Sequence, residues 1–252
     1  MNDFIKMKTE NEITFLKLNR PEKRNALNPE LINTLLSFFK ESKWDPPVKA
    51  IVLSGEGKAF CSGADLKWMN DESAFTSKEM ENLFSLFEAI MSCPLPVISF
   101  AHGFAVGGGL GLLSVSDVVI AEENTQFRFS ETKLGLIPSV ISPFVLRKIG
   151  LSHAKFLMLS ALPFSTKQAQ QIGLAHFIGS KKECDIFLQK ILENFKELDP
   201  SAVSKTKKWL NSAYALPLSQ VKKEGVSLIS EARKTDSARQ RIKNLLENSK
   251  RK

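Results

Sequence analysis

The stretch FAVGGGLGLLSVSD, residues 104–117, follows a predicted strand and places glycine at positions 107, 108, 109 and 111. Glycine brings no side-chain chemistry, and it destabilises the interior of a helix. A strand that ends in a glycine turn at a helix start leaves unpaired backbone N–H groups at the positive end of the helix dipole, which suits an oxyanion. Alternatively, the glycines only let a helix and a strand pack closely. The stretch alone leaves both interpretations open.

Other glycine-rich motifs do not fit this stretch. A dinucleotide-binding GxGxxG motif starting at Gly107 needs glycine at 112, where leucine stands, and the GK[ST] of a phosphate-binding loop is absent. No serine lies in a GxSxG elbow, and the chain has only three histidines. We therefore expect no metal site and no histidine-based triad.

A second stretch, KAFCSGADL at 58–66, has the same form. A predicted strand end leads into the small-residue turn Ser62-Gly63-Ala64, and Asp65 stands near a helix start. Two such turns can each supply one N–H group to a single carbonyl oxygen, which favours the oxyanion interpretation. Cys61 is interpreted as a small core residue without an activating base.

The order of the predicted elements indicates an α/β protein with a helical appendage. Strands are predicted at 12–20, 48–57, 95–103 and 117–123, and helices at 28–44 and 78–91. Asn28 and Pro29 form a good helix start, and Ser165 with Gln168 has capping-box spacing. After about residue 183 only amphipathic helices are predicted. We therefore expect a core at 1–182 with the active site and a helical region at 183–252.

Composition indicates a soluble globular protein of 252 residues, 43% hydrophobic and 25% charged. No apolar run approaches the ~20 residues needed to span a bilayer, and the charged N-terminus lacks an apolar signal region. Three widely spaced cysteines predict no disulfide framework, and together these features indicate a cytoplasmic protein. The net charge of +8 favours anionic partners, although solvated helix faces also account for most lysines.

Five segments together resemble the crotonase superfamily, the enoyl-CoA hydratases and isomerases. They are LNRPEKRNALN (18–28), AFCSGADL (59–66), HGFAVGGGLGLLSVSD (102–117), FSETKLGLIPS (129–139) and the helical C-terminal end. The resemblance implies a ClpP/crotonase-like spiral of ββα turns with a C-terminal helical oligomerisation region. It also implies homotrimers or dimers of trimers.

The resemblance implies a role for particular residues of this chain. The N–H groups of Ala64 and Gly108 match the family's oxyanion hole, which polarises the thioester carbonyl of an acyl-CoA. The positions that match the family's substrate and coenzyme A contacts are Lys23, Arg24, Ala26, Ala64, Asp65, Leu66, Lys67 and Gly108. Each cation among them is as readily interpreted as a surface charge. The resemblance also implies that Asp65 caps the following helix rather than acting as a second acid. Coenzyme A is part of the substrate, so no separate cofactor is expected.

The catalytic carboxylates depart from the family's usual pattern. Hydratases of the family carry two glutamates; Glu131 matches the second, and the first falls on Gly111, with no carboxylate at 110, 112 or 113. One carboxylate suffices to move a proton between carbons, as in Δ3,Δ2-enoyl-CoA isomerases. A bacterial branch assigned to 3-methylglutaconyl-CoA hydration in leucine breakdown, which this chain resembles, also tends to lack the first glutamate.

We therefore expect a hydratase for a branched, methylglutaconyl-type enoyl-CoA, with Glu131 as the catalytic acid and base. Ser139 and Ser142 are candidates to position the water, although each is also a candidate helix cap or core hydroxyl. The alternatives are an isomerase that uses Glu131 alone and a non-catalytic acyl-CoA- or RNA-binding paralogue. RNA binding is disfavoured because the chain shows no RNA-binding motif and has one tyrosine.

Overall fold

The computed structural model describes residues 4–41 and 48–249. The chain divides into two compact units between Lys196 and Glu197, later than the predicted boundary between residues 182 and 183. Helix α7 (Lys181–Glu197) accounts for the difference. Its side chains Cys184, Leu188 and Leu192 are buried in one apolar cluster with residues of the sheet, so this helix belongs with the first unit.

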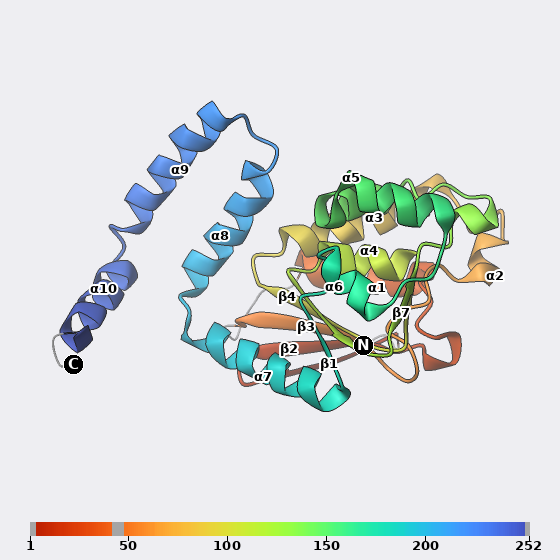
Figure 1. The fold of residues 1–252 in the computed structure, drawn as a ribbon, viewed down its shortest axis with the longest axis horizontal. Helices are drawn as coiled ribbons and strands as arrows, with labels where there is room; N and C mark the ends of the chain where they lie inside the picture. The colour runs from red at the N-terminus through yellow and green to blue at the C-terminus, as the bar shows by residue number, and fades with distance from the viewer. Residues whose placement is uncertain (1–3, 42–47, 250–252) are drawn as a thin grey trace. The chain divides into compact units, whose positions relative to one another are not determined.

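A six-stranded sheet in the order β1-β2-β3-β4-β6-β8 forms the centre of the first unit (Figure 1). Its strands are β1 (Ile5–Glu10), β2 (Ile13–Leu18), β3 (Ala50–Gly55), β4 (Val97–Ala101), β6 (Val118–Glu122) and β8 (Phe177–Gly179). β1 and β2 pair antiparallel, and all later neighbours pair parallel. Parallel neighbours need crossover connections, which the helices provide. A second, two-stranded sheet pairs β5 (Phe104–Val106) with β7 (Gln126–Arg128).

Helices cover both faces of the main sheet (Figure 1). The helices of the first unit besides α7 are α1 (Pro29–Glu41), α2 (Leu66–Met69), α3 (Ser77–Ser92), α4 (Gly108–Val115), α5 (Ser142–Ser160) and α6 (Thr166–Gln171). Two short 3-10 helices, η1 (Pro21–Lys23) and η2 (Thr132–Leu134), lie in the connections. Successive side chains of a strand point to opposite faces of the sheet. In β2, Leu16 and Leu18 belong to the larger apolar cluster, and Ile13 belongs to the cluster with α7.

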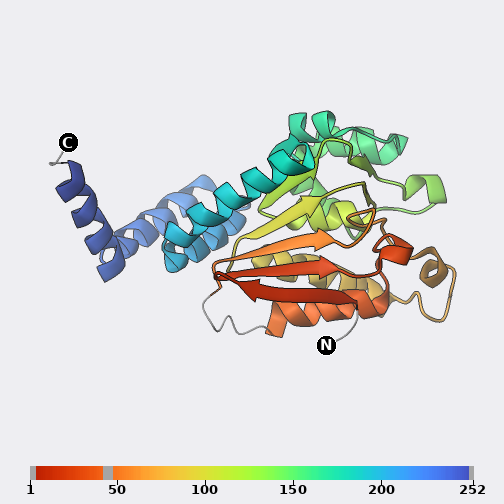
Figure 2. The same ribbon diagram turned by 90° about the horizontal axis from the view of Figure 1, so that it is seen from below.

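The strands of the main sheet run side by side, with β1 at one edge (Figure 2). This ββα arrangement confirms the predicted crotonase-like α/β fold. The predicted strands and helices are present, and Asn28 caps α1 by accepting a hydrogen bond from the Leu31 N–H group at 3.1 Å. The predicted end of that helix, residues 42–44, lies outside the described residues. Ser165 and Gln168 form the predicted capping box of α6.

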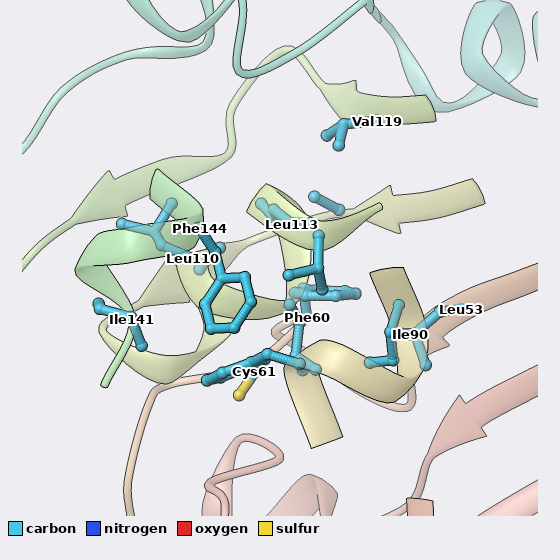
Figure 3. Close-up of a cluster of buried hydrophobic side chains, with 14 of the residues drawn as sticks. Leu53, Phe60, Cys61, Ile90, Leu110, Leu113, Val119, Ile141 and Phe144 are labelled. Atoms are coloured by element: carbon cyan, nitrogen blue, oxygen red, sulfur yellow. The ribbon is translucent and has the colours of Figure 1, made fainter. Parts of the chain in front are cut away.

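Helix α4 is buried along its whole length. Leu110 and Leu113 of α4 lie in a cluster with Phe60 and with Ile141 and Phe144 at the start of α5 (Figure 3). A helix that is apolar on all sides can be stable only inside a core. The glycine stretch thus begins on the cavity described below and continues into the centre of the first unit.

The second unit consists of α8 (Pro200–Ala213), α9 (Leu218–Ala232) and α10 (Asp236–Ser249). Gly225 of α9 packs against the indole of Trp209, where a Cβ would meet the ring at 3.1 Å. Large apolar side chains remain exposed on these helices, among them Leu210, Tyr214, Leu218, Ile229 and Leu245. No described helix is both long enough and apolar enough to cross a membrane.

Candidate active site

Two glycine turns lie against each other at the start of α4. Backbone hydrogen bonds from Cys61 N–H to the Phe104 carbonyl (3.1 Å) and from Val106 N–H to the Cys61 carbonyl (3.0 Å) join their strands. Gly63 and Gly107 adopt φ angles of +91° and +49°, which L-residues with a side chain rarely adopt. A Cβ on Gly63 would lie 3.0 Å from the Val106 carbonyl oxygen. Glycine is therefore needed for both the turn conformation and the close approach.

Among the described residues, the backbone N–H groups of Ala64 and Gly108 donate no backbone hydrogen bond, whereas those of Asp65 and Gly107 do. The Gly107 N–H group donates to the Arg128 carbonyl (3.0 Å), and the Asp65 N–H group donates to the Leu27 carbonyl (2.8 Å). Gly108 is also the first residue of α4, where the helix dipole favours negative charge. These two N–H groups, on adjoining turns, have the chemistry required to stabilise an oxyanion.

Both turns line one cavity of about 780 Å³. All nine residues with predicted catalytic or binding roles line this cavity: Lys23, Arg24, Ala26, Ala64, Asp65, Leu66, Lys67, Gly108 and Glu131. The structure therefore brings together residues more than 100 positions apart in the sequence. Their individual roles remain predictions. The described residues contain no group of three or more His, Cys, Asp or Glu side chains placed to hold a metal ion.

Glu131 brings a buried carboxyl group to the oxyanion turn. It stands directly before η2, and its Oε1 atom would lie 3.0 Å from a Cβ on Gly107. Its Oε2 atom is buried without a hydrogen-bond partner. Burial raises the pKa of the Glu131 carboxyl, and backbone N–H groups of Glu131 and Ser130 oppose this only partly. A carboxyl group with a raised pKa and a free oxygen is suited to take up and release a proton.

Asp65 lines the same cavity but is engaged in structural interactions. One oxygen accepts a hydrogen bond from the Lys67 N–H group at 3.0 Å and so caps α2, and the other pairs with the Arg20 guanidinium at 2.9 Å. Burial raises the pKa of Asp65, but the bonds from Arg20 and Lys67 outweigh it, and the net pKa is lowered. The predicted capping role is confirmed. Cys61 is fully buried, and burial raises its thiol pKa to about 12, so the predicted core role is also confirmed.

The side of α4 at Gly111 is closed by apolar side chains. A Cβ at this position would lie 2.6 Å from Cζ of Phe87 and 3.0 Å from Cγ2 of Ile141. The position that carries the first glutamate in typical hydratases therefore has no carboxylate here, and Phe87 and Ile141 fill the space that a side chain would need. Ser139 lines the cavity, whereas Ser142 is not one of the lining residues, and its hydroxyl donates to the Ser139 carbonyl at 3.3 Å.

Asn25 does not line the cavity, but it supports a segment that does, and the sequence did not single it out. Its buried amide donates to the carbonyls of Ala59 (2.7 Å) and Glu56 (2.9 Å) and accepts from the Arg20 N–H group (2.9 Å). Its φ angle is +56°, next to Arg24 at +50°. Asparagine tolerates this conformation better than most residues, which is the signal that could have identified it. Asn25 thereby holds the loop that brings Lys23, Arg24 and Ala26 to the cavity.

A ββα spiral in which two turn N–H groups and one buried carboxyl group share a cavity defines the crotonase class of proteins. The sequence matches the family described as enoyl-CoA hydratase/isomerase over residues 8–252. The chain belongs to this family.

Individual relatives agree with the family assignment. The chain is 37% identical over 177 residues to enoyl-CoA hydratase AKT6-1 of Alternaria alternata, covering 70% of this chain and 58% of that protein. Among solved structures, AtuE of Pseudomonas aeruginosa has a TM-score of 0.88 at 30% identity, covering 93% of each chain. An enoyl-CoA hydratase/isomerase from Marinobacter aquaeolei has a TM-score of 0.91 at 26% identity, covering 98% of this chain and 97% of that one.

Proposed function

We propose that this protein adds water across the 2,3-double bond of an enoyl-CoA. The N–H groups of Ala64 and Gly108 hold the thioester oxygen, and Glu131 transfers the protons. The observation that carries the proposal is the Glu131 carboxyl group, which lies against the oxyanion turn, is buried, and has an unpartnered oxygen. A relative named as an enoyl-CoA hydratase supports the reaction type.

In the proposed mechanism one carboxyl group serves both proton transfers. The Glu131 carboxylate removes a proton from water while the water oxygen bonds to Cβ of the substrate. The electron pair of the double bond moves to the thioester oxygen, and the two N–H groups stabilise the resulting enolate. Protonated Glu131 then delivers its proton to Cα, which restores the carbonyl and the carboxylate. The raised pKa of Glu131 favours the protonated form that the first transfer produces.

The substrate is proposed to be a branched acyl-CoA, as the resemblance to the methylglutaconyl-type branch suggests. Apolar side chains of α3 and of residues 140 and 141 line the cavity and are able to pack against a methyl branch. Lys23, Arg24 and Lys67 are exposed at the cavity and can meet the phosphates of coenzyme A. The exposed apolar side chains of α8–α10 support the proposal that copies of the chain assemble into trimers or dimers of trimers.

Double-bond isomerisation is a second candidate function, and the closed side of α4 favours it. Phe87 and Ile141 fill the space next to Gly111, so no second carboxylate can stand there to hold a water. Migration of a double bond needs only one group that removes a proton at one carbon and returns it at another. Glu131 alone meets that requirement.

The two candidates are separated by incubating the protein with crotonyl-, 3-methylcrotonyl- and 3-enoyl-CoA in oxygen-labelled water. Hydration incorporates the label into a 3-hydroxyacyl product, and mass spectrometry of the products detects it. We expect labelled product from the branched 2-enoyl ester. Double-bond migration without the label would assign the isomerase instead. No conversion of any ester, together with salt-sensitive RNA binding, would overturn both and favour a binding protein.

A further inference from the structure

Six large apolar side chains line part of the cavity. We refer to Trp68, Phe75, Met80, Leu83, Val140 and Ile141 as the acyl wall, and all six line the cavity. The one polar hydrogen among these side chains, on Trp68 Nε1, is already donated to the Ala74 carbonyl at 3.0 Å. The Trp68 and Phe75 rings pack with centroids 5.1 Å apart. The acyl wall therefore offers a ligand no hydrogen-bond donor from its side chains.

The cations that line the cavity belong to two neighbouring segments. Lys23 and Arg24 lie on one, and Lys67 on the other. The Ser62 N–H group donates to the Arg24 carbonyl at 3.0 Å, which joins the first segment to the oxyanion turn leading into α2. Lys67 is exposed, whereas the adjacent Trp68 is buried. None of the three cations comes from α3 or from residues 140 and 141, which supply most of the acyl wall.

A second groove lies behind part of the acyl wall. Phe75, Met80 and Val140 line both the cavity and this groove of about 470 Å³, so they separate the two. The one titratable residue among its described lining residues is Glu81, an acid whose side chain pairs with Lys78 at 3.7 Å. The described residues that line this groove therefore supply no cation to this end of the cavity.

From this distribution we infer that the substrate's acyl group is uncharged and apolar along its length. This inference rests on the proposed function and names its substrate class. A carboxylate at the end of the acyl chain, as in a glutaconyl ester, would face acyl-wall side chains that supply neither a cation nor a free hydrogen-bond donor, and an unpaired buried charge is costly. The branched part of the expected substrate fits the acyl wall, and its distal carboxylate does not.

Two esters of nearly equal shape test this inference. 3-Methylglutaconyl-CoA carries a carboxylate at the position where 3,5-dimethylhex-2-enoyl-CoA carries an isopropyl group. We expect kcat/KM for the apolar ester to exceed that for the charged ester on the order of 100-fold. Equal values, or a preference for the charged ester, would overturn the inference and leave the proposed hydration intact.

Binding of the saturated esters makes the test independent of turnover. 3,5-Dimethylhexanoyl-CoA and 3-methylglutaryl-CoA cannot be hydrated, and calorimetry measures their dissociation constants directly. We expect the apolar ester to bind at least about tenfold more tightly. Failure of both esters to bind would overturn the acyl-CoA site and the inference with it.

A substitution in the acyl wall should change the preference. Met80→Arg places a cation where the wall meets the second groove, so the guanidinium can reach solvent when no anion is bound. We expect this variant to shift the ratio of the two kcat/KM values by about tenfold toward the charged ester. Met80→Leu, which is apolar and similar in volume, should leave the ratio unchanged. An equal shift in both variants would contradict a role for charge.

Discussion

Asp65 and Glu131 line the same cavity, and each stands directly before a short helix, but their surroundings differ. Asp65 is held by the Arg20 guanidinium and by the N–H group of Lys67, and its pKa is lowered. Glu131 has a buried oxygen without a partner, and its pKa is raised. The contrast shows that the role of a carboxyl group in a cavity depends on whether its oxygens have hydrogen-bond or ion-pair partners. A fully paired carboxylate stabilises the structure, and an unpaired one remains available for proton transfer.

The largest effect is expected for Glu131→Gln, which keeps the shape of the side chain and removes the proton acceptor. We expect kcat to fall about 1,000-fold, because both proposed proton transfers depend on this carboxyl group. Binding of a saturated acyl-CoA, measured by calorimetry, should change less than about threefold because the N–H groups of Ala64 and Gly108 remain. Turnover close to that of the unsubstituted protein would show that Glu131 does not transfer the protons.

Asp65→Asn is the matched substitution on the structural side of the comparison. It leaves the Arg20 charge without its partner, and we expect the free energy of unfolding to fall by about 2 kcal/mol in urea titrations. Turnover per folded molecule should change less than about tenfold. Asp65→Ala also removes the cap of α2 and should cost about 1 kcal/mol more.

A surface ion pair provides the control for this substitution. Asp185 pairs with Lys181 on α7 at 2.6 Å, and both side chains are at least half exposed. Asp185→Asn should therefore lower the free energy of unfolding by less than about 0.5 kcal/mol. If Asp65→Asn had no larger effect than Asp185→Asn, the Arg20 pair would not be a structural element of the site.

A smaller effect than that of Asp65→Asn is expected from the stability cost of Glu131 itself. Because burial raises the folded-state pKa of Glu131, the folded protein loses stability as the pH rises through that pKa. Glu131→Gln should therefore raise the free energy of unfolding above that pKa, which thermal unfolding detects as a higher Tm. This gain in the free energy of unfolding should shrink as the pH falls and vanish below the ordinary pKa of glutamate. A gain that is constant with pH would contradict a cost due to the charge.

Much of the site could be predicted from short segments of the sequence. The small residues and glycines of the turns at residues 62–65 and 107–109 predict two backbone N–H donors for one oxyanion. The absence of a carboxylate at Gly111 is likewise a property of the sequence alone. The lining of the cavity by all nine predicted residues follows from the family's fold, which the motifs specify together with their order and spacing.

The interactions between distant segments could not be predicted. Arg20 and Asp65 are 45 positions apart, and nothing local to either residue indicates the pair. Phe87 reads in the sequence as an ordinary core residue of a helix, and only the packing of α3 shows that it fills the space at Gly111. The burial that raises the pKa of Glu131 likewise depends on residues from several elements. The division after Lys196 depends on contacts between α7 and the sheet in the same way.

Ile141 gives this molecule a particular route for evolutionary change. One of its carbons closes the space beside Gly111, and the same side chain belongs to the acyl wall. A mutation to a smaller residue would enlarge the substrate cavity and relieve part of the packing around position 111 at once. Selection for a bulkier acyl group could thus begin to prepare the chain for a second glutamate, so that substrate range and reaction chemistry would evolve through a shared first step.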